Sequence, residues 1–199
     1  MSNDDQLSKE KSLEIIHQMI HQAKSNITDS GISWLIWGGM LFLASVSTFF
    51  LINSGSVNLF MGWNIFGVLT IILLTYDILI PKRKPVRTYV DDLLRFVDIG
   101  FIVCIFTIIF SININAVIPS VGFGFFLMIF AFLMLIKGGT LRSKALMIGA
   151  VVNWAGAIII FINMDFKNAM LIMATTVMIG YIIPGLLLRI QYKKSNHIR

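Results

Sequence analysis

Charged residues are scarce in this chain of 199 residues. Asp, Glu, Lys and Arg make up 13% of it, whereas a soluble domain typically carries about 25%. Ten acids and sixteen bases cannot cover the surface of a water-soluble protein of 22.4 kDa in which 57% of the residues are hydrophobic. The composition therefore excludes a soluble enzyme and a disordered protein, and it indicates a membrane protein.

Cysteine and the common catalytic motifs are also lacking. The single cysteine, Cys104, lies inside an apolar run, so no intramolecular disulfide can form. The sequence contains no P-loop, no Gly-x-Ser-x-Gly, no His-Glu-x-x-His and no Cys-x-x-Cys. We therefore expect no enzymatic activity, no catalytic residue, no cofactor and no metal site. We also expect no nucleic-acid partner, because the basic residues are dispersed among short loops.

Long apolar runs are what the sequence does have. A helix needs roughly 20 residues to cross a hydrocarbon core of about 30 Å, and six runs have roughly this length. They cover residues 32–53, 59–80, 97–114, 116–136, 145–163 and 169–188. Because backbone polar groups in lipid must be satisfied within the segment, each run is expected to be a helix. The prediction is an all-α polytopic membrane protein with six transmembrane helices, arranged as three hairpins over 32–188, and a basic tail at 189–199.

The basic residues predict the orientation of these helices. Fifteen of the sixteen bases lie before Ile32, between residues 81 and 96, between residues 137 and 144, or after Leu188. The sixteenth is Lys167. Lys and Arg are enriched in cytoplasmic loops. Six spans with this distribution place both termini in the cytoplasm.

Residues 1–31 are predicted to form a cytoplasmic segment with an amphipathic helix within 7–28. Its apolar side chains recur at intervals of three and four residues, and they are Leu13, Ile16, Ile20, Ala23 and Ile27. Three interpretations are open: a helix packed under the bundle or on the membrane surface, an oligomer seam, and a docking site for another protein. His17 and His21 are one turn apart, but no third ligand lies nearby, so solvated residues are favoured over a metal site.

Ionisable residues are missing from the middle of every predicted span. Inside a membrane such residues are costly and are typical of proton relays, ion sites and catalytic centres. Asp77 is the only acid well inside a span, and it lies four residues before Pro81, where it can reach Lys82 or Arg83. We expect a shallow charge partner at Asp77, with a coupling residue as the alternative. The polar residues at depth are neutral and are expected to hydrogen-bond to helices: Ser45, Thr48, Asn64, Thr70, Thr107, Asn153, Thr175 and Thr176.

Small residues mark one face of the fifth span. They let a neighbouring helix approach closely, and together with one polar residue they form a set of helix-contact candidates: Ala145, Gly149, Asn153 and Gly156. In the sixth span Gly180, Pro184 and Gly185 are hinge candidates, because proline kinks a helix. Tolerated packing is the alternative for these three residues. Trp34, at the start of the first span, is expected in an aromatic belt at the membrane interface.

Several segments of packing and interface residues carry a family resemblance. They are Ser-Leu-Glu-Ile-Ile-His-Gln-Met-Ile-His-Gln-Ala-Lys (12–24), Trp-Gly (37–38), Val-Arg-Thr-Tyr-Val-Asp (86–91), Lys-Ala-Leu-Met-Ile-Gly-Ala (144–150) and Ile-Gly-Tyr-Ile-Ile-Pro-Gly-Leu-Leu-Leu (179–188). Through them most of the chain resembles an uncharacterised family of small six-span bacterial inner-membrane proteins. The resemblance implies a multi-pass protein of the bacterial cytoplasmic (inner) membrane, and it transfers no activity and no site residue.

Two functional classes fit these observations. The first is a non-enzymatic scaffold, sensor or regulatory subunit that meets the lipid bilayer, a second copy, or a membrane or cytoplasmic protein through 7–28. The second is a small oligomeric channel or transporter for a neutral solute. A water-filled cavity at mid-depth lined by Asn64, Asn153 and Thr175 would favour transport, and a dry core would favour the first class.

Overall fold

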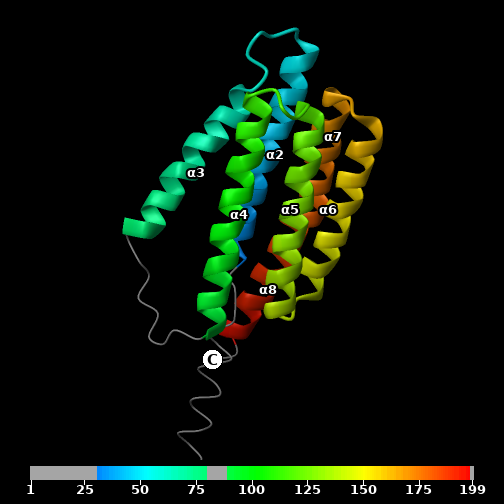
Figure 1. Cartoon of the computed structure of the whole chain (residues 1–199). Helices are drawn as coiled ribbons and strands as arrows, with labels where there is room; N and C mark the ends of the chain where they lie inside the picture. The colour runs from blue at the N-terminus through cyan, green and yellow to red at the C-terminus, as the bar shows by residue number, and fades with distance from the viewer. Residues whose placement is uncertain (1–30, 80–88, 198–199) are drawn as a thin grey trace, which may run out of the picture.

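The computed structural model describes residues 31–79 and 89–197, and every regular element in these two ranges is a helix (Figure 1). The elements are α2 (Ile32–Asn53), α3 (Met61–Leu79), α4 (Tyr89–Asn113), α5 (Pro119–Thr140), α6 (Lys144–Asn163), α7 (Phe166–Val177), the π-helical turn η1 (Met178–Ile182) and α8 (Ile183–His197). Successive helices run in opposite directions, except that α7, η1 and α8 continue one another. The all-α prediction is confirmed for these residues.

The helices follow the predicted spans but differ from them at several ends. α2 has the predicted bounds, and α6 begins one residue earlier than predicted. α4 begins at Tyr89, before the apolar run at 97–114, and α8 continues to His197 rather than stopping at Leu188. The predicted basic tail is therefore largely a continuation of the last helix.

Within residues 31–79 and 89–197, five helical segments are long and apolar enough to cross a membrane. They are Ile32–Asn53, Asp92–Asn113, Pro119–Thr140, Lys144–Asn163 and Phe166–Lys194. The second predicted span provides a shorter apolar stretch, Met61–Leu73. The helices are thus those of a polytopic membrane protein, and the count of six spans stays a prediction.

The helices divide into a packed core and two peripheral members. α5 and α6 form the most extensive pair, and α2, α7 and η1 complete the core. Within the described ranges, the backbone of α3 comes close only to α2, and the backbone of α4 only to α5. Figure 1 shows α3 leaning away from the bundle toward its C-terminal end. The most extensive contact, between α5 and α6, therefore joins helices that belong to two different predicted hairpins.

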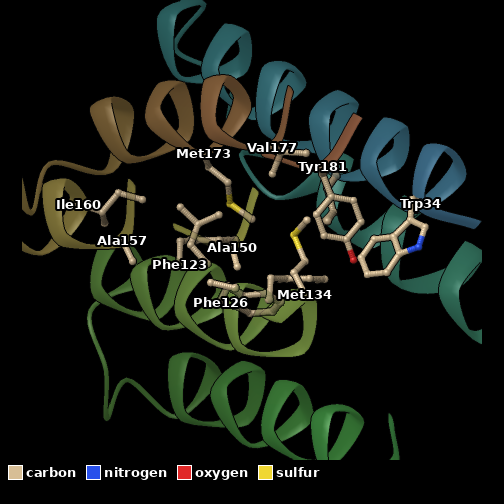
Figure 2. Close-up of a cluster of buried hydrophobic side chains, with 14 of the residues drawn as sticks. Trp34, Phe123, Phe126, Met134, Ala150, Ala157, Ile160, Met173, Val177 and Tyr181 are labelled. Atoms are coloured by element: carbon tan, nitrogen blue, oxygen red, sulfur yellow. The ribbon is translucent and has the colours of Figure 1, made fainter. Parts of the chain in front are cut away.

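The core is a continuous cluster of side chains from α2, α5, α6 and the helix formed by α7, η1 and α8 (Figure 2). Leu127 and Met134 of α5 and Met170 and Met173 of α7 are completely buried. By contrast, no residue of Asp92–Asn113 in α4 is buried. Since apolar side chains gain nothing by leaving lipid, close van der Waals packing has to hold such a core together.

Some glycines lie where two helices pack closely, and others have open space beside them. A methyl group on Gly124 of α5 would lie 2.5 Å from the ring of Phe161 of α6. In the peripheral helices, Gly67 of α3 and Gly100 of α4 have no atom of a neighbouring helix within 4 Å of the same position. Small residues in membrane helices let two backbones approach. The core helices use this property, and α3 and α4 leave it unused at these two positions.

Candidate functional site

The face of α6 that carries the predicted small residues packs against the helix formed by α7, η1 and α8. Gly149, Asn153 and Gly156 are buried, whereas Ala145 is half-buried. A methyl group on Gly149 would collide with the carbonyl oxygen of Gly180, and one on Gly156 with a threonine side chain of α7. Only glycine leaves room for these two helices to cross at this distance. We call this contact the Asn153 crossing.

Asn153 lies at the centre of the Asn153 crossing with 0% of its surface exposed. Its side-chain Nδ2 donates to the carbonyl oxygen of Gly149, at 2.8 Å, and contacts Sδ of Met134 on α5, at 3.5 Å. Across the crossing, a methyl group on Gly180 would lie 2.5 Å from the same nitrogen. Asn153 Oδ1 is buried with no hydrogen-bond partner among the described residues. The amide is thus enclosed by three helices and faces no opening.

The helix opposite Asn153 changes its hydrogen-bonding pattern at the crossing. Over Met178–Ile182 the helix is π-helical, and the N–H of Ile183 donates to the carbonyl oxygen of Met178. Pro184 follows and has no N–H to donate. π-Helical turns are rare and occur frequently at functional sites. The hinge candidates Gly180, Pro184 and Gly185 therefore lie inside or directly after an irregular turn of a membrane helix.

Two aromatic side chains pack side by side next to this turn. The ring of Tyr181 lies 5.1 Å from the ring of Trp34 and 5.8 Å from the ring of Phe130, and Figure 2 shows the first pair. Trp34 is 5% exposed, and its Cβ lies 3.0 Å from where Gly185 would carry a methyl group. Trp34 therefore packs inside the bundle, in the space that Gly185 leaves open, and its expected depth at the membrane interface stays a prediction.

An ion pair joins α4 to α5 at one end of the bundle. Lys137 Nζ lies 2.7 Å from Asp98 Oδ1 and 6.0 Å from the centre of the Trp34 ring system. The starts of α2, α4 and α6 and the ends of α5 and α8 lie at this end, which is the lower one in Figure 1. We call it the basic end. The sequence did not lead us to predict this ion pair. One span begins near Asp98 and the next ends near Lys137, so the two residues lie at the same depth in the membrane.

The neutral polar residues at depth bond mainly to their own helices. In six of the eight, a hydroxyl or amide donates to the carbonyl oxygen one turn earlier: Ser45, Thr48, Thr107, Asn153, Thr175 and Thr176. Asn64 and Thr175 are exposed on the surface of the bundle, whereas Asn153 is enclosed in the core. The three residues that would line a transport cavity are not brought together.

A shallow groove lies between α2 and α3 on the outside of the bundle. Its volume is about 710 Å³, and its lining residues are Met40, Leu43, Ala44, Ser47, Phe50, Leu51, Ser54, Met61, Gly62, Ile65, Phe66 and Leu69. Leu43 and Phe50 are 66% and 63% exposed, so the groove opens outward. Its lining contains no charged group. A groove of this kind suits apolar chains and offers no group for catalysis.

Some predicted features lie outside the described residues. They include the amphipathic segment 7–28 with His17 and His21, and the side chain of Asp77, whose backbone belongs to α3. Within residues 31–79 and 89–197, no three His, Cys, Asp or Glu side chains gather to hold a metal ion. The expectations for Asp77 and for the two histidines therefore stay predictions.

Comparison with known proteins provides no relative, since no family model, no curated protein and no solved structure matches the chain. The resemblance to small six-span bacterial proteins thus remains a prediction. Function has to be argued from the described residues themselves.

Proposed function

We propose that the chain is a six-span protein of the bacterial cytoplasmic membrane that acts without catalysis as a scaffold, sensor or regulatory subunit. The observation that carries this proposal is the bonding of the polar residues at depth, six of which donate to carbonyls of their own helices. A solute pathway needs polar groups that face a shared opening. Polar groups that bond within their own helices serve packing. The surface of the bundle is then the part that can bind a partner.

The length of α3 supports a sixth span. α3 contains 19 residues. At 1.5 Å per residue, a helix of that length extends for about 28 Å, close to the hydrocarbon thickness of about 30 Å. With six spans, the distribution of bases places both termini in the cytoplasm.

The two peripheral helices supply a surface for partners. In α3 and α4, large apolar side chains stand out from the bundle, among them Val68 at 58% exposure and Phe96 at 70%. The sides of α3 and α4 that carry these exposed residues are available to another membrane helix. A subunit or scaffold needs surfaces of this kind, whereas a membrane enzyme needs a converging set of reactive groups.

Reporter fusions test the topology. A reporter fused after Arg199 and another inserted at Ser56 should indicate opposite sides of the membrane. A third at Lys82 should agree with the one after Arg199, because α3 crosses between Ser56 and Lys82. Agreement between the reporters at Ser56 and Lys82 would exclude a membrane-spanning α3 and with it the six-span topology.

Co-purification tests the function. The tagged full chain, extracted from its native membrane in mild detergent, should retain a partner protein in fixed stoichiometry. The double substitution Val68→Ala and Ile72→Ala on the exposed side of α3 should weaken retention, whereas Met147→Ala and Ile148→Ala on the exposed side of α6 should not. The alternative is a small oligomeric channel or transporter. Recovery without a partner, together with passage of glycerol or urea through vesicles that contain the purified protein, would favour that alternative.

A further inference from the structure

Several unpaired cations lie at one level of the bundle, at its basic end. The ion pair between Asp98 and Lys137 aligns α4 with α5, so Arg95, one turn before Asp98, is level with the end of α5. Arg142 and Lys144 belong to the turn between α5 and α6 and to the first residue of α6. These three side chains are exposed.

The last helix brings a fourth cation to the same level. Gly149 of α6 meets Gly180, and the two helices are antiparallel, so Lys144 is level with Gly185, and Arg189 lies about one helical turn beyond it. A methyl group on Gly31, directly before α2, would lie 2.8 Å from the backbone nitrogen of Arg189, which fixes Arg189 at the start of the first span. Arg189 is exposed as well. Within the described ranges, none of the four cations (Arg95, Arg142, Lys144 and Arg189) forms an ion pair. We call these four the cation layer.

One residue of the cation layer, Lys144, lies where its own helix does not favour a cation. Lys144 is the first residue of α6, where the helix dipole disfavours a positive charge. The nearest described acids do not neutralise the layer, since Asp98 is paired with Lys137 and Asp92 is exposed without an ion pair. An anion from outside the described residues therefore fits here.

The arrangement of the cation layer indicates which anion. The four side chains come from three separate parts of the bundle: α4, the turn between α5 and α6, and α8. They stand where the apolar stretches end, at the depth at which lipid headgroups lie and at which long basic side chains reach for them. Cations distributed over three parts of the bundle suit several small anions better than one peptide.

We propose that the cation layer binds acidic glycerophospholipids through their phosphate groups. Arg142 and Lys144 on one side and Arg189 on the other hold headgroups against the bundle, and Arg95 holds one beside α4. The acyl chains lie along the exposed apolar sides of the same helices. This inference goes beyond the proposed function, and it stands whether the protein is a scaffold or a channel.

Lipid retention tests the proposal. The full chain is purified in a neutral detergent, mixed with equal amounts of phosphatidylglycerol and phosphatidylcholine, and analysed by native mass spectrometry. The wild type should retain phosphatidylglycerol in preference. A basic side chain near an anionic membrane surface favours binding by about fivefold, so the double variant Arg142→Gln and Lys144→Gln should lose most of the preference. Lys167→Gln, which removes a cation at the opposite end, should keep it.

Two controls make the result decisive. Each variant must keep the melting temperature of the wild type in the neutral detergent, and Lys193 and Lys194 are left intact so that the topology is preserved. Equal retention of the two lipids by the wild type, or an unchanged preference in all four single variants of the cation layer and in the double variant, would overturn the proposal. A preference for phosphatidylglycerol that appears only after residues 1–30 are deleted would also overturn the proposal. In that case the acidic residues of 1–30 would bind the cation layer in the full chain.

Discussion

The Asn153 crossing and the peripheral helix α3 are built from similar residues and pack in opposite ways. Both contain glycine and asparagine, Gly149 and Asn153 in the first and Gly67 and Asn64 in the second. At the crossing, glycine admits a carbonyl oxygen of the next helix and asparagine is completely buried. In α3, glycine has open space beside it and asparagine is exposed.

The contrast teaches that the neighbouring helix, not the residue type, gives a small residue its role. Gly149 faces Gly180 because the π-helical turn and Pro184 shape the opposite helix at that level. Gly67 faces no helix, since the backbone of α3 approaches only α2. A membrane core gains stability from fit alone, so one well-matched crossing contributes more than a longer but looser contact.

The largest effect is expected from removing packing in the core. Leu127→Ala, at a completely buried position of α5, should lower the free energy of unfolding by about 2 kcal/mol. That is the low end of the range for soluble cores, because a bilayer adds no hydrophobic term. Ile109→Ala, at a position of α4 that is 40% exposed, should change it little. Unfolding in detergent by increasing amounts of dodecyl sulfate measures both, and equal losses would contradict the division into core and periphery.

A glycine pair sharpens the comparison. Gly149→Ala should destabilise by about 1 kcal/mol, the low end of the range for overpacking, because the added methyl group meets a backbone carbonyl that cannot move aside alone. Gly67→Ala should leave stability unchanged or raise it by up to about 1 kcal/mol, since alanine is the better helix former. The same unfolding assay applies. A neutral Gly149→Ala would show that the crossing can separate at no cost.

The two asparagines provide a weaker contrast. Asn153→Leu should lower stability by less than about 1 kcal/mol, because polar contacts between membrane helices average about 0.6 kcal/mol. Asn64→Leu should have no effect on unfolding, since its side chain is exposed. Loss of partner retention in Asn153→Leu with an unchanged melting temperature would contradict the packing role and indicate contact with a ligand.

The smallest effect is expected for the ion pair at the basic end. Asp98→Asn should cost about 0–1 kcal/mol, because Asp98 and Lys137 are 44% and 27% exposed and water screens the pair. The difference from the wild type should shrink in high salt. Asp92→Asn on the same helix is the control, and an equal effect there would show that the pair itself contributes nothing.

The sequence was sufficient for the elements and for part of the site. Apolar runs predicted every described helix, since lipid forces each run to satisfy its own backbone. The spacing of Gly149, Asn153 and Gly156 predicted a contact face, because residues three and four apart lie on one side of a helix. Pro184 and its glycines marked the region of the irregular turn.

Partners across helices could not be predicted in the same way. Nothing in the sequence near Trp34 indicates that Gly185, far along the chain, opens a place for its ring in the core. The extensive pairing of α5 with α6 also depends on which sides of the two helices are complementary in shape. Hydropathy does not indicate those sides, because both helices are apolar over most of their length. The ion pair between Asp98 and Lys137 was within reach of a topological argument, because antiparallel spans align their ends.

The π-helical turn makes α7 and α8 two differently phased halves of one membrane segment. Each π turn contains one residue more than an α turn, so the residues after Ile182 are rotated by about 100° from the positions that an unbroken α-helix would give them. That rotation turns Gly185 toward α2 and leaves Leu186 and Leu187 on the outside. A single-residue deletion within the turn would rotate the whole of α8 by about 100° and turn Gly185 away from α2. The residues of this span that face the core therefore follow one helical register in α7 and another in α8.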